Sequence, residues 1–186
     1  MNGFFKYFVV TCLAALAIGC NPQTITLPTQ VQAQFSEETD PKINLTTVDE
    51  KGFADVVAKH KGEVVLVDFW ATWCGPCVEG FPHTVDLHKK YQDQGLATIS
   101  LSFDSPDDEA KVRTFLAGQG ATFDNLISKY GTALVDAANA FDFEGSLPHY
   151  RLYDRSGKLR KSWSPDSAQP AELEQLLKEL LAEKAP

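Results

Sequence analysis

The feature that most constrains the fold is a continuous apolar stretch that leads directly into a pair of cysteines. Residues 64–70 read Val-Val-Leu-Val-Asp-Phe-Trp, and Cys74 and Cys77 follow in the segment Trp-Cys-Gly-Pro-Cys. An apolar run of this length is typical of a central strand that is buried on both faces of a sheet. Pro76 suits a first helical turn, where its missing N–H would have had no partner. The stretch therefore predicts a buried strand, a short turn and a helix that begins at the cysteines.

Two cysteines with two residues between them, after a strand and at the start of a helix, indicate a dithiol that cycles with a disulfide. The free N–H groups and the dipole of a helix N-terminus stabilise an anion at Cys74. The thiolate is the attacking form in disulfide exchange, so Cys74 is the predicted nucleophile. Cys77, one turn further along, is placed to resolve a mixed disulfide formed on Cys74.

Two other interpretations of the cysteine pair remain open. A structural zinc site usually needs a second pair of Cys or His ligands. The remaining cysteines are Cys12 and Cys20, both near the N-terminus, and the four histidines show no ligand pairing. A structural disulfide across so short a loop would restrict the unfolded chain only slightly. We therefore expect no metal and no cofactor other than the redox-active disulfide Cys74–Cys77.

The spacing of apolar residues changes along the chain and predicts an alternating series of helices and strands. The predicted helices are 49–60, 75–92, 106–118, 129–141 and 170–183, and the predicted strands are 64–70, 96–103, 150–153 and 159–163. The last two strands form a hairpin around residues 154–157. An acidic cluster, namely Asp104, Asp107, Asp108 and Glu109, lies near one helix start and is interpreted as helix-capping, with partner docking as an alternative.

The segment Trp73-Cys74-Gly75-Pro76-Cys77 is the same as the active-site motif of thioredoxin. Over residues 43–183 the chain resembles the thioredoxin superfamily, and in particular its TlpA/ResA-like extracytoplasmic branch. The resemblance implies an α/β thioredoxin fold, with a central mixed β-sheet flanked by helices and an insertion at about 118–145, before the cis-proline strand. It also implies that Pro82 kinks the active-site helix and that Pro148 is the cis-proline opposite the dithiol.

The resemblance assigns roles to residues around the cysteines. The implied catalytic residues are Cys74, Cys77 and Asp68, and the implied substrate-binding residues are Trp73, Gly75, Pro76, Leu147 and Pro148. Asp68 stands inside an apolar strand, where burial raises the pKa of a carboxyl group and suits it to accept the proton of Cys77. A strand-end residue satisfied by hydrogen bonds is the alternative. His149 either tunes Cys74 electrostatically or is packed or exposed on its strand.

The N-terminal residues are typical of a targeting segment. Residues 1–19 contain an apolar run of signal-peptide length, and the segment Ala17-Ile18-Gly19-Cys20 resembles a bacterial lipobox, although Ala17 replaces the usual leucine. We expect a lipoprotein signal peptide over 1–19, lipid attachment at Cys20, a flexible tether over 20–42 and the thioredoxin-like domain over 43–186. An uncleaved anchor, ordinary cleavage at Ala33 and a cytoplasmic form remain alternatives.

The chain carries a net charge of −8, and removal of residues 1–19, whose only charged residue is Lys6, makes it −9. Such a charge argues against a nucleic-acid partner. We expect a monomer that acts on protein disulfides, is held at a membrane by its lipid and faces the periplasm or the cell surface.

The predicted activity is reduction of disulfides. The Cys-Gly-Pro-Cys motif matches thioredoxin, whose potential is about −270 mV, rather than the oxidant DsbA at about −120 mV. Family members often serve cytochrome c maturation and are re-reduced by a membrane thiol-reductant donor. A disulfide oxidase or isomerase, and a copper-handling module that uses Cys74, Cys77 and one histidine, are the alternatives.

Overall fold

The computed structural model describes residues 43–165 and 170–184. The predicted signal peptide, the tether and Cys20 lie outside these ranges. The sheet has six strands in the order β1-β4-β3-β2-β5-β6. The first four in this order are parallel neighbours, whereas β5 pairs antiparallel with β2 and β6 pairs antiparallel with β5. The sheet is therefore mixed, as predicted.

The elements follow one another with short connections. In chain order they are β1 (Leu45–Val48), α2 (Glu50–Lys59), β2 (Val64–Trp70), α3 (Gly75–Tyr91), η2 (Gln92–Gln94), β3 (Leu96–Ser102), η3 (Pro106–Asp108), α4 (Glu109–Gln119), β4 (Asp124–Ser128), α5 (Leu134–Phe141), β5 (His149–Tyr153), β6 (Leu159–Trp163) and α6 (Pro170–Ala182).

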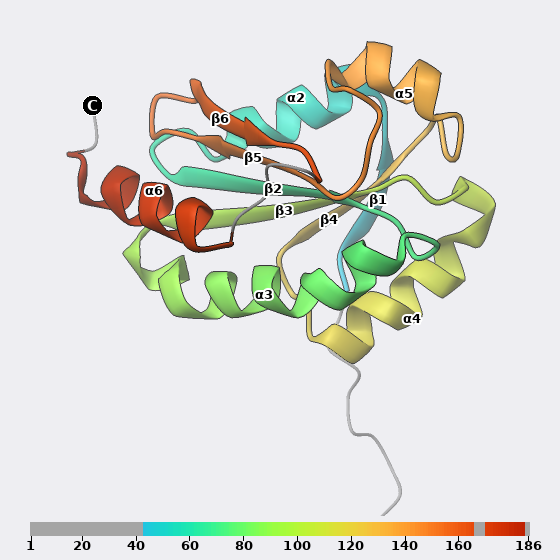
Figure 1. The fold of residues 1–186 in the computed structure, drawn as a ribbon, viewed down its shortest axis with the longest axis horizontal. Coiled ribbons are helices and arrows are strands. Elements are labelled where there is room, and N and C mark those ends of the chain that lie inside the picture. Colours follow the sequence, from blue (N-terminus) through green and yellow to red (C-terminus); the bar gives the residue numbers. More distant parts are fainter. Residues whose placement is uncertain (1–42, 166–169, 185–186) are drawn as a thin grey trace, which may run out of the picture. The chain divides into compact units, whose positions relative to one another are not determined.

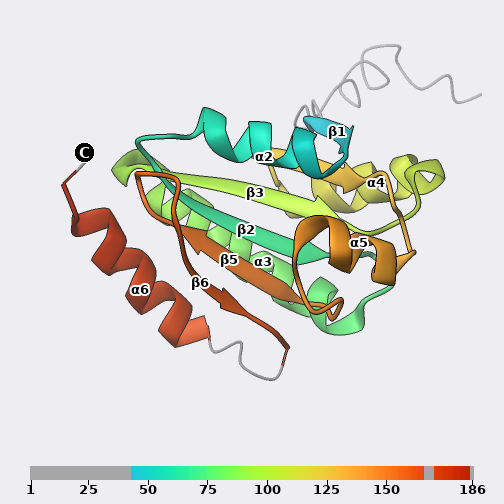
Figure 2. The ribbon, with the colours of Figure 1, turned by 90° about the horizontal axis from the view of Figure 1, so that it is seen from above.

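Helices cover both faces of the sheet (Figure 1). Helices α3, α4 and α6 pack on one face, and α2 and α5 pack on the other. The view from above shows β2 in the middle of the sheet, between β3 and β5 (Figure 2). All seven residues of β2 are buried, as the continuous apolar run predicts for a central strand.

Side chains of β2 alternate between the two faces because successive residues of a strand point to opposite sides. Trp70 packs on the α3 face, with its ring 4.7 Å from that of Phe81. Phe69 packs on the α2 face, 5.8 Å from the ring of Phe53 and 5.6 Å from that of Phe103. Residues at even positions of β2, Asp68 among them, therefore face α3.

The structure differs from the sequence predictions in two strands and in the starts of two helices. Strands β1 and β4 were not predicted, and the helix expected over 129–141 begins only at Leu134. Residues 129–132 form turns in which Gly131 has φ +53°, a conformation that favours glycine and is incompatible with an α-helix. The helix expected over 106–118 begins as the 3₁₀ turn η3 and continues as α4.

Candidate active site

The two cysteines lie at the start of α3, just after the short connection from β2. Cys74 is the N-cap residue of α3 and forms a disulfide with Cys77, and Pro76 lies within the first turn. The Sγ atom of Cys74 accepts a hydrogen bond from the backbone N–H of Cys77 at 3.3 Å. A sulfur atom at this position accepts a hydrogen bond from one of the backbone N–H groups that a helix N-terminus leaves free. The same N–H group would stabilise a thiolate after reduction.

The surroundings of the disulfide are exposed on one side only. Trp73 is 46% exposed, and Gly75 and Pro76 are also exposed. The two cysteines themselves are buried in this oxidised state, because Cys74 is 7% and Cys77 2% exposed. Both cysteines pack in a hydrophobic cluster with Trp70 and Phe81.

The loop before β5 borders the same cluster. The Leu147–Pro148 peptide bond is cis, as the resemblance implies. Leu147 is partly buried and packs against the cluster that contains Cys74 and Cys77. The structure thus brings the predicted substrate-binding residue Leu147 against the cluster that holds the dithiol, although it lies 70 residues further along the chain.

Asp68 is buried on the α3 side of β2, with 1% exposure. Its Oδ2 atom accepts a hydrogen bond from the Thr84 hydroxyl at 2.6 Å, and its Oδ1 atom has no hydrogen-bond partner among the described residues. Burial raises the pKa of the Asp68 carboxyl group from 3.8 to about 7, and the Thr84 hydrogen bond opposes this rise only in part. The carboxyl group is therefore poised to exchange a proton near neutral pH.

Tyr150 and Thr84 complete the polar environment of Asp68. Tyr150 is the register partner of Asp68 in the β2–β5 pair, so the two side chains share the α3 face. The charge of Asp68 and burial together raise the pKa of the Tyr150 hydroxyl. Neither Thr84 nor Tyr150 was predicted from sequence, because their relation to Asp68 depends on strand register and helix packing.

His149 faces the opposite side of the sheet from the dithiol. Its ring lies 5.2 Å from that of Phe69 and 5.4 Å from that of Phe143, and it is 1% exposed. Burial and the nearby Arg151 lower the pKa of His149 to about 4, against the opposing charge of Glu144. His149 is therefore neutral at neutral pH and supplies no charge to Cys74, so the packing interpretation is the correct one.

Arg151 is a buried residue that sequence reasoning missed. Its guanidinium donates hydrogen bonds to the backbone carbonyls of Phe141, at 2.8 Å, and Asp142. These carbonyls lie at the C-terminal end of α5, where helix carbonyls lack partners within the helix. Arg151 thus fixes the end of α5, from which the chain continues to the cis-proline loop.

The acidic cluster is not a single feature. Three of its members are exposed, namely Asp107, Asp108 and Glu109. Asp104 is 1% exposed and accepts a hydrogen bond from the backbone N–H of Thr72, in the turn before Cys74. The capping interpretation is therefore wrong for Asp104. The position of Asp104 directly after a predicted buried strand could have indicated a separate role for it, but the three acidic residues that follow it suggested a single cluster.

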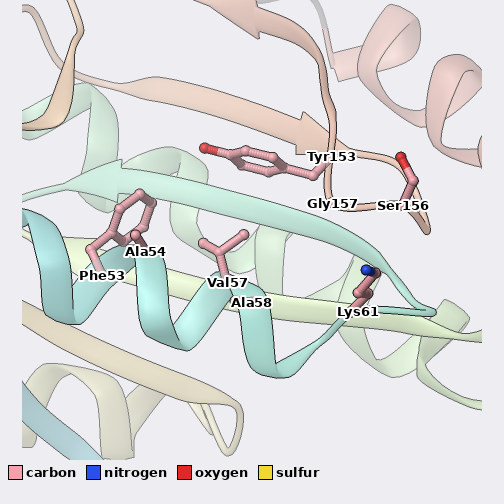
Figure 3. Close-up of a pocket in the computed structure, with 8 residues that line it drawn as sticks. All are labelled: Phe53, Ala54, Val57, Ala58, Lys61, Tyr153, Ser156 and Gly157. Atoms are coloured by element: carbon pink, nitrogen blue, oxygen red, sulfur yellow. The ribbon is translucent and has the colours of Figure 1, made fainter.

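A pocket of about 420 Å³ lies between α2 and the β5–β6 turn, not at the dithiol (Figure 3). Phe53, Val57 and Tyr153 line its apolar side, and Lys61 and Ser156 lie at one end. Tyr153 pairs with Val65 at the start of β2, whereas the dithiol follows the end of that strand. Within residues 43–165 and 170–184, no group of three His, Cys, Asp or Glu side chains is arranged to hold a metal ion, and no helix is long and apolar enough to span a membrane.

Comparisons with known proteins agree with this geometry. The sequence profile of the AhpC/TSA family matches residues 37–162. The thiol–disulfide oxidoreductase ResA of Geobacillus thermodenitrificans is 30% identical over 132 residues, which cover 68% of this chain and 72% of that protein. ResA of Bacillus cereus is 31% identical over 116 residues, so the match spans 63% of that relative's own length and 62% of this chain. A solved Chlorobium tepidum structure, assigned as the thiol:disulfide interchange protein DsbE, is 29% identical with a TM-score of 0.56, over 68% of this chain and 85% of that one.

Proposed function

Because the chain belongs to the AhpC/TSA family and is a thiol–disulfide oxidoreductase with a thioredoxin fold, we propose that it reduces protein disulfides outside the cytoplasm. The observation that carries this proposal is the Cys74–Cys77 disulfide at the N-terminus of α3, with a helix N–H aimed at the Cys74 sulfur. That arrangement stabilises a thiolate on the more exposed of the two cysteines.

The reaction runs from the reduced protein. The Cys74 thiolate attacks one sulfur of a substrate disulfide, forms a mixed disulfide and releases the other substrate sulfur as a thiolate. Cys77 then loses its proton and attacks the Cys74 sulfur, which releases the second substrate thiol. Two electrons pass to the substrate, and the protein is left with the disulfide between Cys74 and Cys77.

The substrate chain docks beside the disulfide. Trp73, Gly75 and Pro76 offer the exposed surface around Cys74, and the backbone of Leu147 pairs with an extended substrate segment as a short added strand. Asp68, whose Oδ1 atom has no hydrogen-bond partner among the described residues, accepts the proton of Cys77. This protein therefore uses a dithiol and one buried acid.

Electron flow and location complete the proposal. The Gly-Pro pair between the cysteines favours a low potential near that of thioredoxin, about −270 mV. A reductant of this kind in an oxidising compartment depends on a membrane thiol donor for its own reduction, and cytochrome c maturation is the process we propose for it. A potential near −120 mV would instead indicate an oxidase or isomerase, and a copper titration would test copper handling.

Trapping of mixed disulfides tests the proposed function. The Cys77→Ser variant retains the nucleophile but lacks the resolving thiol, so it should accumulate mixed disulfides with its protein substrates. Electrophoresis without reductant, followed by identification of the captured proteins, measures this. The Cys74→Ser/Cys77→Ser double variant is the matched control. If the single variant captures no more protein than the double variant, the proposed function is wrong.

Anchoring through Cys20 is a separate prediction. Cys20→Ala should move the protein from the membrane fraction to the soluble fraction without changing the disulfide-reducing activity of the domain. Cys12→Ala, within the apolar run, is the matched control and should leave the protein in the membrane fraction. Mass spectrometry of the mature N-terminus provides the direct measurement. An unmodified terminus elsewhere, for example after Ala33, would contradict lipid attachment.

A further inference from the structure

Asp104 lies directly beside the turn that carries the dithiol, although it is far from the cysteine motif in sequence. Strands β2 and β3 run parallel, and their pairing continues beyond β3 through a hydrogen bond from Phe103 N to Trp70 O at 2.9 Å. The carboxyl ends of the two strands therefore bring Asp104 next to residues 71–73. The side chain of Asp104 is 1% exposed.

The carboxylate of Asp104 accepts three hydrogen bonds. Its Oδ2 atom accepts from the backbone N–H of Thr72 at 2.8 Å and from the Ser102 hydroxyl at 2.7 Å, and its Oδ1 atom accepts from the Thr72 hydroxyl. Among the described residues no lysine, arginine or histidine forms an ion pair with it. Because a buried carboxylate is costly without partners, these contacts fix its position firmly.

We propose that Asp104 is a positioning residue of the dithiol site, which fixes the turn that presents Trp73 and Cys74 and places its negative charge next to that turn. The inference rests on the proposed disulfide exchange at Cys74. Thr72 is held at both its backbone and its side chain, and a hydrogen bond from Cys74 N to Ala71 O at 3.1 Å closes the turn that contains Thr72. Two bonds from one carboxylate therefore tie the active-site turn to β3.

The charge of Asp104 acts on the reduced state. Two peptide units separate Thr72 from Cys74, so the length of the chain keeps the carboxylate within roughly 14 Å of the Cys74 sulfur. A negative charge at this distance disfavours the thiolate and so favours the disulfide. Cys77, Val112 and Leu116 belong to the cluster that contains Cys74, and Leu147 packs against it. Asp68 lies on the same face of the sheet, where it accepts a hydrogen bond from Thr84 of α3.

Asp104→Asn tests the effect of charge, because asparagine keeps the size and one acceptor oxygen. Asp107→Asn, an exposed acid on η3, is the matched control. The pH dependence of Cys74 alkylation and the equilibrium with glutathione are measured in both variants. We expect the pKa of Cys74 to fall by about half a unit to one unit in Asp104→Asn. The equilibrium should shift toward the dithiol by up to about tenfold, equal to about 30 mV, and Asp107→Asn should match the wild type.

Thr72 tests the positioning effect while the charge stays in place. Thr72→Val should slow attack of reduced Cys74 on oxidised glutathione several-fold at a fixed thiolate fraction, and Thr72→Ser, which keeps the hydroxyl, should restore it. If Asp104→Asn does not fold, the two Thr72 variants still test whether the contact between Asp104 and Thr72 positions the active-site turn. Equal Cys74 pKa values in Asp104→Asn and Asp107→Asn, or equal rates in the two Thr72 variants, would overturn the inference. Neither readout needs a protein substrate, so these results stand apart from a failure to trap one.

Discussion

Cys74→Ser should abolish reduction of insulin disulfides, with a loss on the order of 10³-fold or more. The N-cap position supplies the Cys77 N–H and the helix dipole to the Cys74 sulfur, and a serine hydroxyl cannot replace the thiolate that these groups stabilise. Cys77→Ser should retain a single attack but should not turn over. A turbidity assay of insulin reduction measures steady turnover, and single-turnover mixing with a disulfide reporter measures the first attack.

The reduced protein offers a check on which cysteine attacks. The N-terminus of α3 should lower the pKa of the Cys74 thiol below the free value of about 8.5, so Cys74 should react first with iodoacetamide at neutral pH. Cys77 is the more buried residue and should react slowly. Peptide mapping after brief alkylation distinguishes the two. Faster labelling of Cys77 would reverse the assigned roles.

The site around the motif could be predicted from sequence because its parts are contiguous. Residues 64–77 contain a buried strand, a turn and a helix start in one stretch, and the structure places β2 and the start of α3 as predicted. The apolar context of Asp68 was enough to predict its burial and the direction of its pKa change. Local pattern and local chemistry agree here, and such agreement makes a prediction reliable.

Strand β4 shows why the rest could not be predicted. It begins with Asp124 and Asn125, which do not suggest a strand. Asn125 is nevertheless 1% exposed, because its side chain accepts a hydrogen bond from the Ser100 hydroxyl at 2.7 Å and donates to the carbonyls of Ala121 and Phe123. Its polarity is thus satisfied by partners that only the folded chain supplies.

The same limit applies to the residues that support the dithiol. Asp104, Thr84 and Arg151 each act through a hydrogen bond to a segment between 9 and 32 residues away. Parallel pairing of β2 and β3 creates the Asp104 contact, and packing of α3 on β2 creates the Thr84 contact. The cysteine motif is therefore readable from sequence, but the contacts that tune it are properties of the fold.

Asp68→Asn should change stability and catalysis together. Below pH 3.8 the Asp68 carboxyl group is protonated in both the unfolded and the folded protein. As the pH rises toward 7, it ionises in the unfolded chain first, so the folded state loses stability through this range. A pKa raised from 3.8 to about 7 corresponds to about 4 kcal/mol of lost stability above pH 7. Asparagine cannot ionise, so the variant should lose none of this stability.

Urea melts of the oxidised protein at pH 4 and pH 8 measure the stability effect. The difference in unfolding free energy between Asp68→Asn and the wild type should favour the variant by a few kcal/mol more at pH 8 than at pH 4. The reason is that only the wild type carries the ionised carboxylate at pH 8. Asp86→Asn, an exposed acid on α3, is the matched control and should show no such dependence. Asparagine retains an oxygen that accepts from the Thr84 hydroxyl, so loss of that hydrogen bond does not complicate the comparison.

The kinetic effect of Asp68→Asn should appear in the second step of the reaction. Cys77 must lose its proton before it attacks the mixed disulfide, and the buried carboxylate is its proposed acceptor. We expect resolution to slow by roughly tenfold to a hundredfold near pH 7, while the first attack by Cys74 stays close to the wild-type rate. Rapid mixing with a substrate that forms an observable mixed disulfide separates the two steps. An unchanged resolution rate together with an unchanged stability profile would mean that Asp68 neither titrates near neutrality nor takes the Cys77 proton.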